Sequence, residues 1–248
     1  MNRAKDSMEK EPVWDIDHGR IEEVIKKVKK EGRNTLLENE ARKVLDAAGI
    51  PMAEGKVVHD IHSCVEAAER IGYPVVLKVV SEDIIHKMDV GGVETGIQNE
   101  KELLDAYESI YSQVRNKKPR AKIRGISISE HIEGGEEVVI GGMIDPSFGP
   151  VVMFGLGGIY IEVIKDVVFR IAPIDAQEAC DMVREIKSFS ILIGERGKGK
   201  KDLRALAEMI SRLGDLIYFV DDIQDIDLNP VASLEKGAVA LDVAINIK

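Results

Sequence analysis

The strand-like run PVVLKVV, residues 74–80, constrains this chain more than any other feature, because one lysine, Lys78, interrupts an otherwise apolar stretch. Burying an ammonium group without a partner costs on the order of several kcal/mol. An anion facing Lys78 would remove that cost. Alternatively, the run is an edge strand and the lysine reaches water along its own stem. The strand alone does not decide between these two interpretations.

A polar loop follows the strand and places His86 ahead of the pair Gly91 and Gly92 in the stretch HKMDVGGV. Two glycines can turn backbone N–H groups toward phosphate oxygens, although Gly-Gly is also a common hairpin turn. His86 offers a ring nitrogen that is nucleophilic near neutral pH. The alternative interpretation is that His86 is an ordinary loop histidine without a chemical role. Neither element is specific by itself.

Composition narrows the class of partner. The 248 residues carry 34 Lys and Arg against 44 Asp and Glu, a net charge of −10. This is the opposite of the basic surface that nucleic-acid binding requires, so we expect no nucleic-acid partner and an anion held by local lysines and backbone amides. No run approaches the roughly 18 apolar residues of a membrane span. Two cysteines without metal-ligand spacing suit a reducing, cytoplasmic setting.

Helical and strand patterns divide the chain into two units. Apolar spacing predicts a helix from Ile21 that Gly32 stops, and a second helix that Thr35 and Glu38 begin as a capping box. Strands and helices then alternate in α/β order, and short strands separated by Gly, Asp and Pro favour an antiparallel sheet further on. We expect an α/β (α+β) chain with a helical extension at 1–33, a larger unit at 34–50 and 129–248, and a smaller unit at 51–128.

Oxygen ligands gather near the C-terminus in the stretch DIDLNP. Asp227 and Asn229 occupy alternate positions of a predicted strand and so point to one face, and Asp242 in the next predicted strand could lie opposite. Carboxylate and amide oxygens suit Mg²⁺ when phosphate supplies the remaining ligands. A solvated turn is the alternative. The sequences G-x-G-x-x-G and G-x-x-x-x-G-K-[ST] are both absent, so neither common nucleotide signature is present.

In their order and wording, four blocks of sequence resemble the ATP-grasp fold, and more closely the β subunits of ADP-forming acyl-CoA synthetases, relatives of the succinyl-CoA synthetase β chain. The blocks are IGYPVVLKVVSEDIIHK, DVGGVETGI, the long run GGEEVVIGGMIDPSFGPVVMFGLGGIYIEVIKDVVFRIAPID, and DIDLNPV. The resemblance covers about residues 34–248. It implies two subdomains with the nucleotide bound between them.

The same resemblance implies roles for individual residues. Those expected at the nucleotide are Lys78 on the α and β phosphates, Glu130 and Ile132 at the hinge that reads adenine and ribose, Glu137 as an acidic residue of the site, and Arg170 near the phosphates. For Arg170 a structural salt bridge is the alternative. Asn229 and Asp242 resemble the metal pair, with Asp227 in the acidic place of the motif. Glu162 and Asp166 are expected to support the site. His86 matches a histidine that this family phosphorylates.

The implied reaction is a phosphoryl relay that uses ATP or ADP with Mg²⁺. An α subunit carrying CoA-binding domains and its own phosphohistidine would supply the phosphoryl group, in an expected α2β2 assembly, and His86 would pass it to ADP. Two alternatives remain. One is an ATP-grasp carboxylate–amine ligase, which needs no phosphohistidine, and the other is a non-catalytic nucleotide-binding regulatory module.

Overall fold

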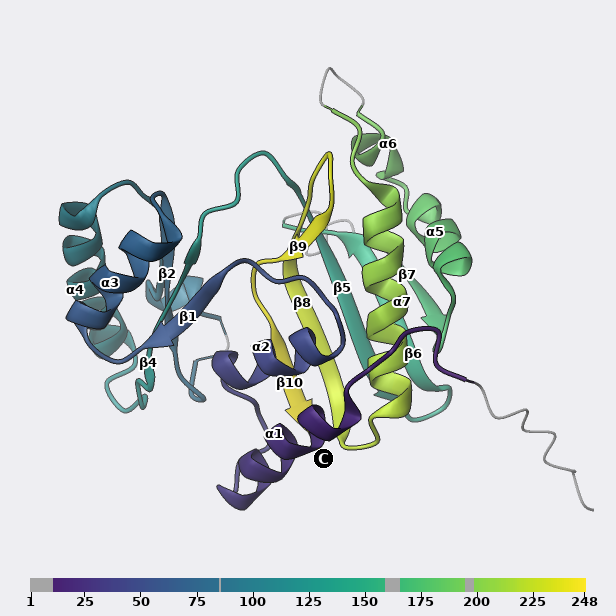
Figure 1. Ribbon diagram of the computed structural model, residues 1–248, viewed down its shortest axis with the longest axis horizontal. Coiled ribbons are helices and arrows are strands. Elements are labelled where there is room, and N and C mark those ends of the chain that lie inside the picture. The colour runs from purple at the N-terminus through teal and green to yellow at the C-terminus, as the bar shows by residue number, and fades with distance from the viewer. Residues whose placement is uncertain (1–10, 85, 159–165, 195–198) are drawn as a thin grey trace, which may run out of the picture.

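The computed structural model describes residues 11–84, 86–158, 166–194 and 199–248. Two units lie side by side, and each is a sheet with helices packed against it (Figure 1). Among the described residues, no helix combines the length and the apolar character that crossing a membrane would require.

The smaller unit is a four-stranded sheet in the order β1-β4-β2-β3, covered by two helices. All of its paired strands are antiparallel, although its elements alternate in α/β order. The reason is that β4 lies between β1 and β2, which would otherwise be the parallel neighbours of a βαβ unit. Its elements are β1 (Gly55–Val58), α3 (Ile61–Ile71), β2 (Val75–Val80), the 3-10 turn η1 (Met88–Val90), β3 (Val93–Ile97), α4 (Glu100–Lys117) and β4 (Gly125–Glu130).

The larger unit is a six-stranded antiparallel sheet in the order β10-β8-β5-β6-β7, with β9 paired to β8. The long helix α7 packs across β5, β6 and β8, and α5 packs on α7 (Figure 1). The predicted antiparallel sheet is therefore confirmed. Its elements are β5 (Glu136–Asp145), β6 (Gly149–Leu156), β7 (Val167–Ile171), α5 (Ala176–Glu185), α6 (Phe189–Leu192), α7 (Leu203–Phe219), β8 (Ile223–Ser233), β9 (Ala238–Ala240) and β10 (Ala244–Ile247).

The N-terminal segment belongs to the core of the larger unit, contrary to the expectation of an extension outside it. Helix α1 (His18–Lys30) buries one apolar stripe in that core, and Ile16 joins it. Trp14 donates from its indole Nε1 to Ser211 Oγ at 2.9 Å, while the guanidinium of Arg212 lies 3.9 Å from the centre of its ring. Residues 14–16 are therefore fixed to α7 and to the core by specific contacts.

Helix α2 (Glu38–Ala47) begins differently from the prediction. Glu40, rather than Glu38, closes the first turn, because its carboxylate accepts from the backbone N–H of Leu37 at 2.8 Å. Thr35 contacts Asn246 of β10 instead of capping the helix. The proposed Thr35–Glu38 capping box is therefore wrong, since the hydroxyl is used in a contact that only the folded chain creates.

Two separate apolar clusters underlie the two units. One is built from residues 16–50 and 138–247, and the other from residues 58–128. Polar contacts join the units where α2 meets the smaller sheet. Ser127 of β4 donates to Glu38 Oε1 at 2.5 Å in a buried position, and Arg42 donates to the backbone carbonyl of Ala53 at 2.6 Å. Both contacts lie close to the segment where the chain passes from the larger unit to the smaller one. They connect α2 to the smaller sheet and to the segment just before it.

The last strand of the sequence prediction is broken in two. In place of one predicted strand holding Asp242 there are two: β9 pairs with Val231–Ser233, and β10 pairs with the other half of β8. The turn Leu241–Val243 bridges the two. Asp242 therefore lies in a turn. The residue of β10 that pairs with Asp227 is Ala244, not Asp242.

Candidate functional site

A cavity of about 580 Å³ lies between the two units and takes side chains from both. The smaller unit contributes β2, the loop after it, β3 and the end of β4. The larger unit contributes the start of β5, the middle of β8 and the turn between β9 and β10. The lining residues used below are Lys78, His86, Lys87, Glu130, Ile132, Glu137, Asn229, Leu241 and Asp242.

Lys78 projects from β2 toward the larger unit. Val75, Leu77 and Val79 pack in the core under the helices, so strand alternation places Lys78 on the opposite face. Its residue is only 8% exposed, and its Nζ donates to the backbone carbonyl of Leu241 at 2.5 Å. Since β2 lies inside the sheet between β4 and β3, the edge-strand interpretation is wrong. A carbonyl dipole compensates the ammonium here, and the cavity offers room for an anion beside it.

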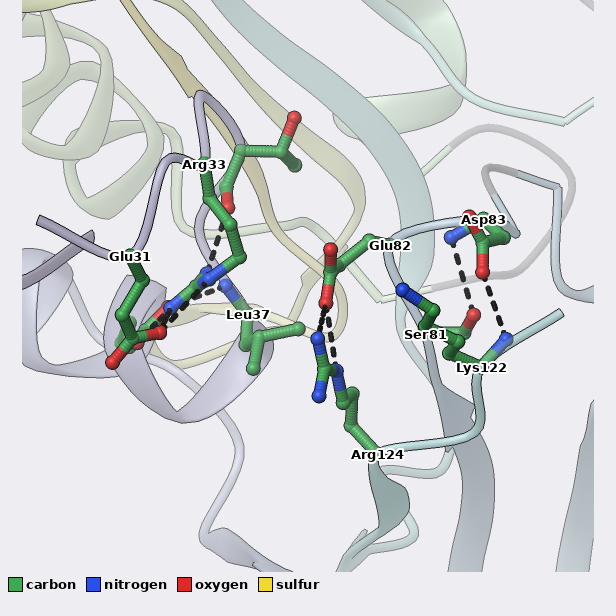
Figure 2. A network of polar contacts seen from close by, with 10 residues as sticks. Glu31, Arg33, Leu37, Ser81, Glu82, Asp83, Lys122 and Arg124 are labelled. Atoms are coloured by element: carbon green, nitrogen blue, oxygen red, sulfur yellow. Dashed lines mark hydrogen bonds and ion pairs between the residues drawn. The ribbon is translucent and has the colours of Figure 1, made fainter. Parts of the chain in front are cut away.

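The chain leading to His86 is tied by polar contacts to the segment just before β4 (Figure 2). Arg124 Nε donates to Glu82 Oε1 at 2.7 Å, and the backbone N–H of Lys122 donates to Asp83 Oδ2 at 2.8 Å. His86 follows, exposed and facing the cavity. An exposed imidazole at the mouth of a cavity can meet both a bound ligand and a group arriving from outside.

Lys87, which the sequence analysis did not single out, forms the main ionic contact across the cavity. Its Nζ lies 2.7 and 3.0 Å from the two carboxylate oxygens of Asp242. Both side chains are about one-fifth exposed. In the sequence, Lys87 is marked only by its position next to His86. Its partner Asp242 is 155 residues away and lies in the turn between β9 and β10.

Gly91 and Gly92 shape the loop but do not offer free amides to the cavity. The N–H of Gly91 donates to Met88 O at 3.0 Å, and the N–H of Gly92 donates to Lys87 O at 2.8 Å. Gly91 has a φ of +68°, and a Cβ on Gly92 would lie 2.5 Å from Val79 Cγ1. The expected phosphate-binding role of these amides is therefore contradicted, because the turn itself uses both donors. The glycines are needed for a tight turn packed against β2.

Three residues expected at the nucleotide, namely Glu130 and Ile132 at the base and ribose and the acidic Glu137, line the cavity where the chain crosses from β4 to β5. Glu130 is anchored there, since its carboxylate accepts from the backbone N–H of Glu54 at 2.8 Å and its own N–H donates to Glu54 O at 2.8 Å. Ile132 is half-buried, and Glu137 is exposed at the start of β5. This wall combines the apolar side chain of Ile132 with the polar side chains of Glu130 and Glu137, a mixture typical of small-molecule sites.

The three oxygen ligands predicted for a metal lie near one another. Asn229 and Asp242 line the cavity, and Asp227 lies two residues before Asn229 on β8. Burial raises the pKa of Asp227 above its ordinary value, the Asn229 side chain opposes this, and the carboxylates of Asp242 and Asp225 raise it further. Among the described residues no three His, Cys, Asp or Glu side chains form a metal-binding group. A cation here would use the Asn229 amide oxygen and the Asp242 carboxylate together with oxygens of a bound ligand, which fits Mg²⁺.

Arg170 and Asp166 lie apart from the cavity. Arg170 of β7 contacts Glu185 and lies 3.7 Å from Glu178, both on α5, so the salt-bridge alternative is the one observed. Asp166 is buried and accepts from the backbone N–H groups of Lys187 and Ser188 at 2.8 Å each. Burial favours its neutral form, yet these hydrogen bonds hold the pKa of Asp166 below its ordinary value. Neither side chain reaches the site, and Glu162 lies outside the described residues.

Comparison with known families agrees with this geometry. A family described as an ATP-grasp domain matches residues 27–247. The chain therefore belongs to the ATP-grasp family. Within it, the chain is related to the β subunits of ADP-forming acetate–CoA ligases. The ligase I β subunit of Pyrococcus furiosus is 45% identical over 220 residues, which cover 89% of this chain and 94% of that protein.

Longer relatives contain the same unit. The ADP-forming 4-hydroxybutyrate–CoA ligase of Nitrosopumilus maritimus is 40% identical over 98% of this chain but over only 35% of its own length. A chain of Ca. Korarchaeum cryptofilum dinucleotide forming acetyl-coenzyme A synthetase 1, in complex with coenzyme A, Ca-AMPCP and HgCl+, superposes with a TM-score of 0.89 at 38% identity. The match covers 91% of this chain and 99% of that chain.

A second structure of that synthetase contains coenzyme A and Mg-AMPPCP, with its phosphohistidine segment pointing towards the nucleotide-binding site. It has a TM-score of 0.80 at 36% identity and covers 92% of this chain and 100% of that chain. The fold of this chain is thus that of a nucleotide-binding chain from an ADP-forming acyl-CoA synthetase.

Proposed function

We propose that this chain is the nucleotide-binding β subunit of an ADP-forming acyl-CoA synthetase, in which His86 passes a phosphoryl group to ADP. The whole enzyme would convert acyl-CoA, phosphate and ADP into the free acid, CoA and ATP. The observation that carries the proposal is the single cavity in which Lys78, His86 and the pair Asn229 and Asp242 come together from two units. A carboxylate–amine ligase would leave His86 without a role.

The chemical step at this chain is a transfer between two nucleophiles. The P–N bond to the imidazole breaks while a terminal phosphate oxygen of ADP forms the new P–O bond, and the ring leaves as the neutral base. Little covalent assistance is needed, because such transfers depend mainly on position and charge stabilisation. The ammonium of Lys78 would stabilise the phosphate oxygens as negative charge builds up, and the wall of Glu130 and Ile132 would orient the purine.

Three residues would hold a divalent cation in this arrangement. Asn229 and Asp242 would bind Mg²⁺ directly with phosphate oxygens, and Asp227 would orient the Asn229 amide. The cation would supply charge neutralisation between the phosphates of the nucleotide. Asp227 is half-buried, and its desolvation and the nearby carboxylates of Asp242 and Asp225 raise its pKa, so a cation beside these carboxylates would be stabilised.

The phosphoryl group would reach His86 from a partner. Two relatives from Pyrococcus furiosus are named as β subunits, which implies an α subunit in those enzymes. We infer that an α subunit with CoA-binding domains and its own phosphohistidine joins this chain, and that the assembly is α2β2. His86 suits the receiving role because it is exposed at the cavity and accessible to a segment from another chain.

The test is to assemble the chain with an α subunit and follow CoA release and ATP formation from acetyl-CoA, phosphate and ADP. His86→Asn should abolish ATP formation and the acid-labile phosphate on this chain, while ADP affinity stays within about twofold. His62→Asn is the matched control, because His62 is an exposed histidine on α3 outside the cavity. Full turnover by His86→Asn would refute the relay and leave only nucleotide binding.

A further inference from the structure

Two lysines of the smaller unit bind the same turn of the larger unit. Lys78 Nζ donates to the carbonyl of Leu241, and Lys87 Nζ contacts both carboxylate oxygens of the next residue, Asp242. The backbone N–H of Leu241 still donates to Pro230 O of β8 at 2.9 Å, while the two lysines bind the turn Leu241–Val243 to the smaller unit. Both lysines, the turn that they bind and Asn229 line the same cavity between the units.

The Lys87 contact is geometrically complete. Lys87 Nζ lies 2.7 Å from one carboxylate oxygen of Asp242 and 3.0 Å from the other, so the ammonium group contacts both oxygens. The backbone N–H of Val243 donates to Asp242 Oδ1 as well, at 2.9 Å. A cation bound by Asp242 from within the cavity would therefore compete with Lys87 for the same oxygen atoms.

We propose that Lys87 is a positioning residue that neutralises Asp242 until a divalent cation displaces it, and that this displacement frees the loop that carries His86. The inference deepens the proposed function and rests on it, because it treats Asp242 as a ligand of the cation. A doubly charged ion with nucleotide oxygens competes well against a single half-buried ammonium. Lys87 directly follows His86, so releasing its side chain removes the tether nearest to the phosphoryl-accepting ring.

The proposal explains why a lysine lies beside a histidine at this point. In the closed contact the loop is held by its own ion pair, and the charge of the Asp242 carboxylate is balanced by the Lys87 ammonium. Once displaced, the ammonium of Lys87 would remain within a side chain's length of the cavity, where it could meet phosphate oxygens on His86 or on the nucleotide. The ion pair thereby couples cation binding to the position of the phosphoryl acceptor.

The experiment measures Mn²⁺ binding to the nucleotide-free protein by electron paramagnetic resonance, up to 10 mM metal. Lys87→Met should bind Mn²⁺ about fivefold more tightly than the natural protein, the factor expected from removing a competing ion pair of ordinary strength. Lys29→Met is the matched control. Lys29 also forms a 2.7 Å pair with an aspartate of another element, Asp222, but outside the cavity. The control should bind Mn²⁺ like the natural protein.

Hydrogen exchange of residues 88–92 gives a second measurement that needs no turnover. Lys87→Met and Asp242→Asn should each raise exchange about fivefold without metal, and the double variant should raise it no further. In the natural protein Mn²⁺ should produce the same increase. Unchanged or weaker Mn²⁺ binding by Lys87→Met, or no binding by 10 mM, would overturn the displacement. If Lys87→Met binds Mn²⁺ no more tightly than the natural protein but Asp242→Asn abolishes binding, the displacement fails and the metal site of the proposed function still stands.

Discussion

Replacing Lys78 by Met separates nucleotide binding from folding. Methionine keeps the length of the side chain and removes its charge. In the folded protein the lysine is 8% exposed and its Nζ donates to Leu241 O. A hydrogen bond from a charged donor contributes about 1.5–3 kcal/mol, but taking the ammonium out of water costs an amount of similar order. The Leu241 carbonyl borders the cavity, where water can replace the lost donor.

The two effects predict different outcomes with and without ligand. Without nucleotide, Lys78→Met should change the free energy of unfolding by no more than about 1 kcal/mol, because the two terms oppose each other. With Mg-ADP, the variant should lose about 2 kcal/mol of binding, which is about 30-fold in Kd. At a nucleotide concentration 100 times the natural Kd, ligand should stabilise the natural protein by about 2.7 kcal/mol and the variant by only about 0.9 kcal/mol.

The assay is urea unfolding of both proteins with and without Mg-ADP. Lys201→Met is the matched control, since Lys201 is also buried and donates from Nζ to a backbone carbonyl, that of Gly134 at 3.0 Å, without lining the cavity. The control should keep the full ligand stabilisation. If Lys78→Met gains as much stability from nucleotide as the natural protein, Lys78 does not contact the phosphates and the reasoning fails.

Three further predictions concern stability. Arg33→Met leaves the buried carboxylate of Glu40 without its ion pair, so the free energy of unfolding should fall by about 3 kcal/mol in urea titrations, and a change below about 1 kcal/mol would contradict this. Gly92→Ala places a methyl group 2.5 Å from Val79 Cγ1 and should cost about 1–3 kcal/mol; an unaltered urea midpoint would count against it. Asp202→Ala removes the N-cap of α7, which should cost about 1 kcal/mol at pH 7. Backbone hydrogen bonds hold the folded pKa of Asp202 below its ordinary 3.8, so the ionised carboxylate stabilises the fold above that value, and the difference between the proteins should shrink as the pH falls through the folded pKa. A difference that grows in acid would refute this assignment.

The sequence by itself determined the parts of this protein that depend on local pattern. Apolar spacing located α1, because a helix buries a stripe that repeats every 3.6 residues. The lysine in an apolar strand indicated a polar partner, and the wording of four blocks identified the family. Lys78, His86 and Asn229 were all named from local residue types and motif wording, and all three line the cavity.

Only the tertiary structure decided which donors and acceptors are still available. Both glycine amides are used inside their own turn, and Arg170 contacts α5, although each had the right chemistry for phosphate. Thr35 could cap a helix but contacts Asn246 across the fold. The contact of Lys87 with Asp242 joins residues 155 positions apart. Local pattern cannot reveal such a pair. It requires a turn between β9 and β10 and the contact of two units, and both depend on packing over the whole chain.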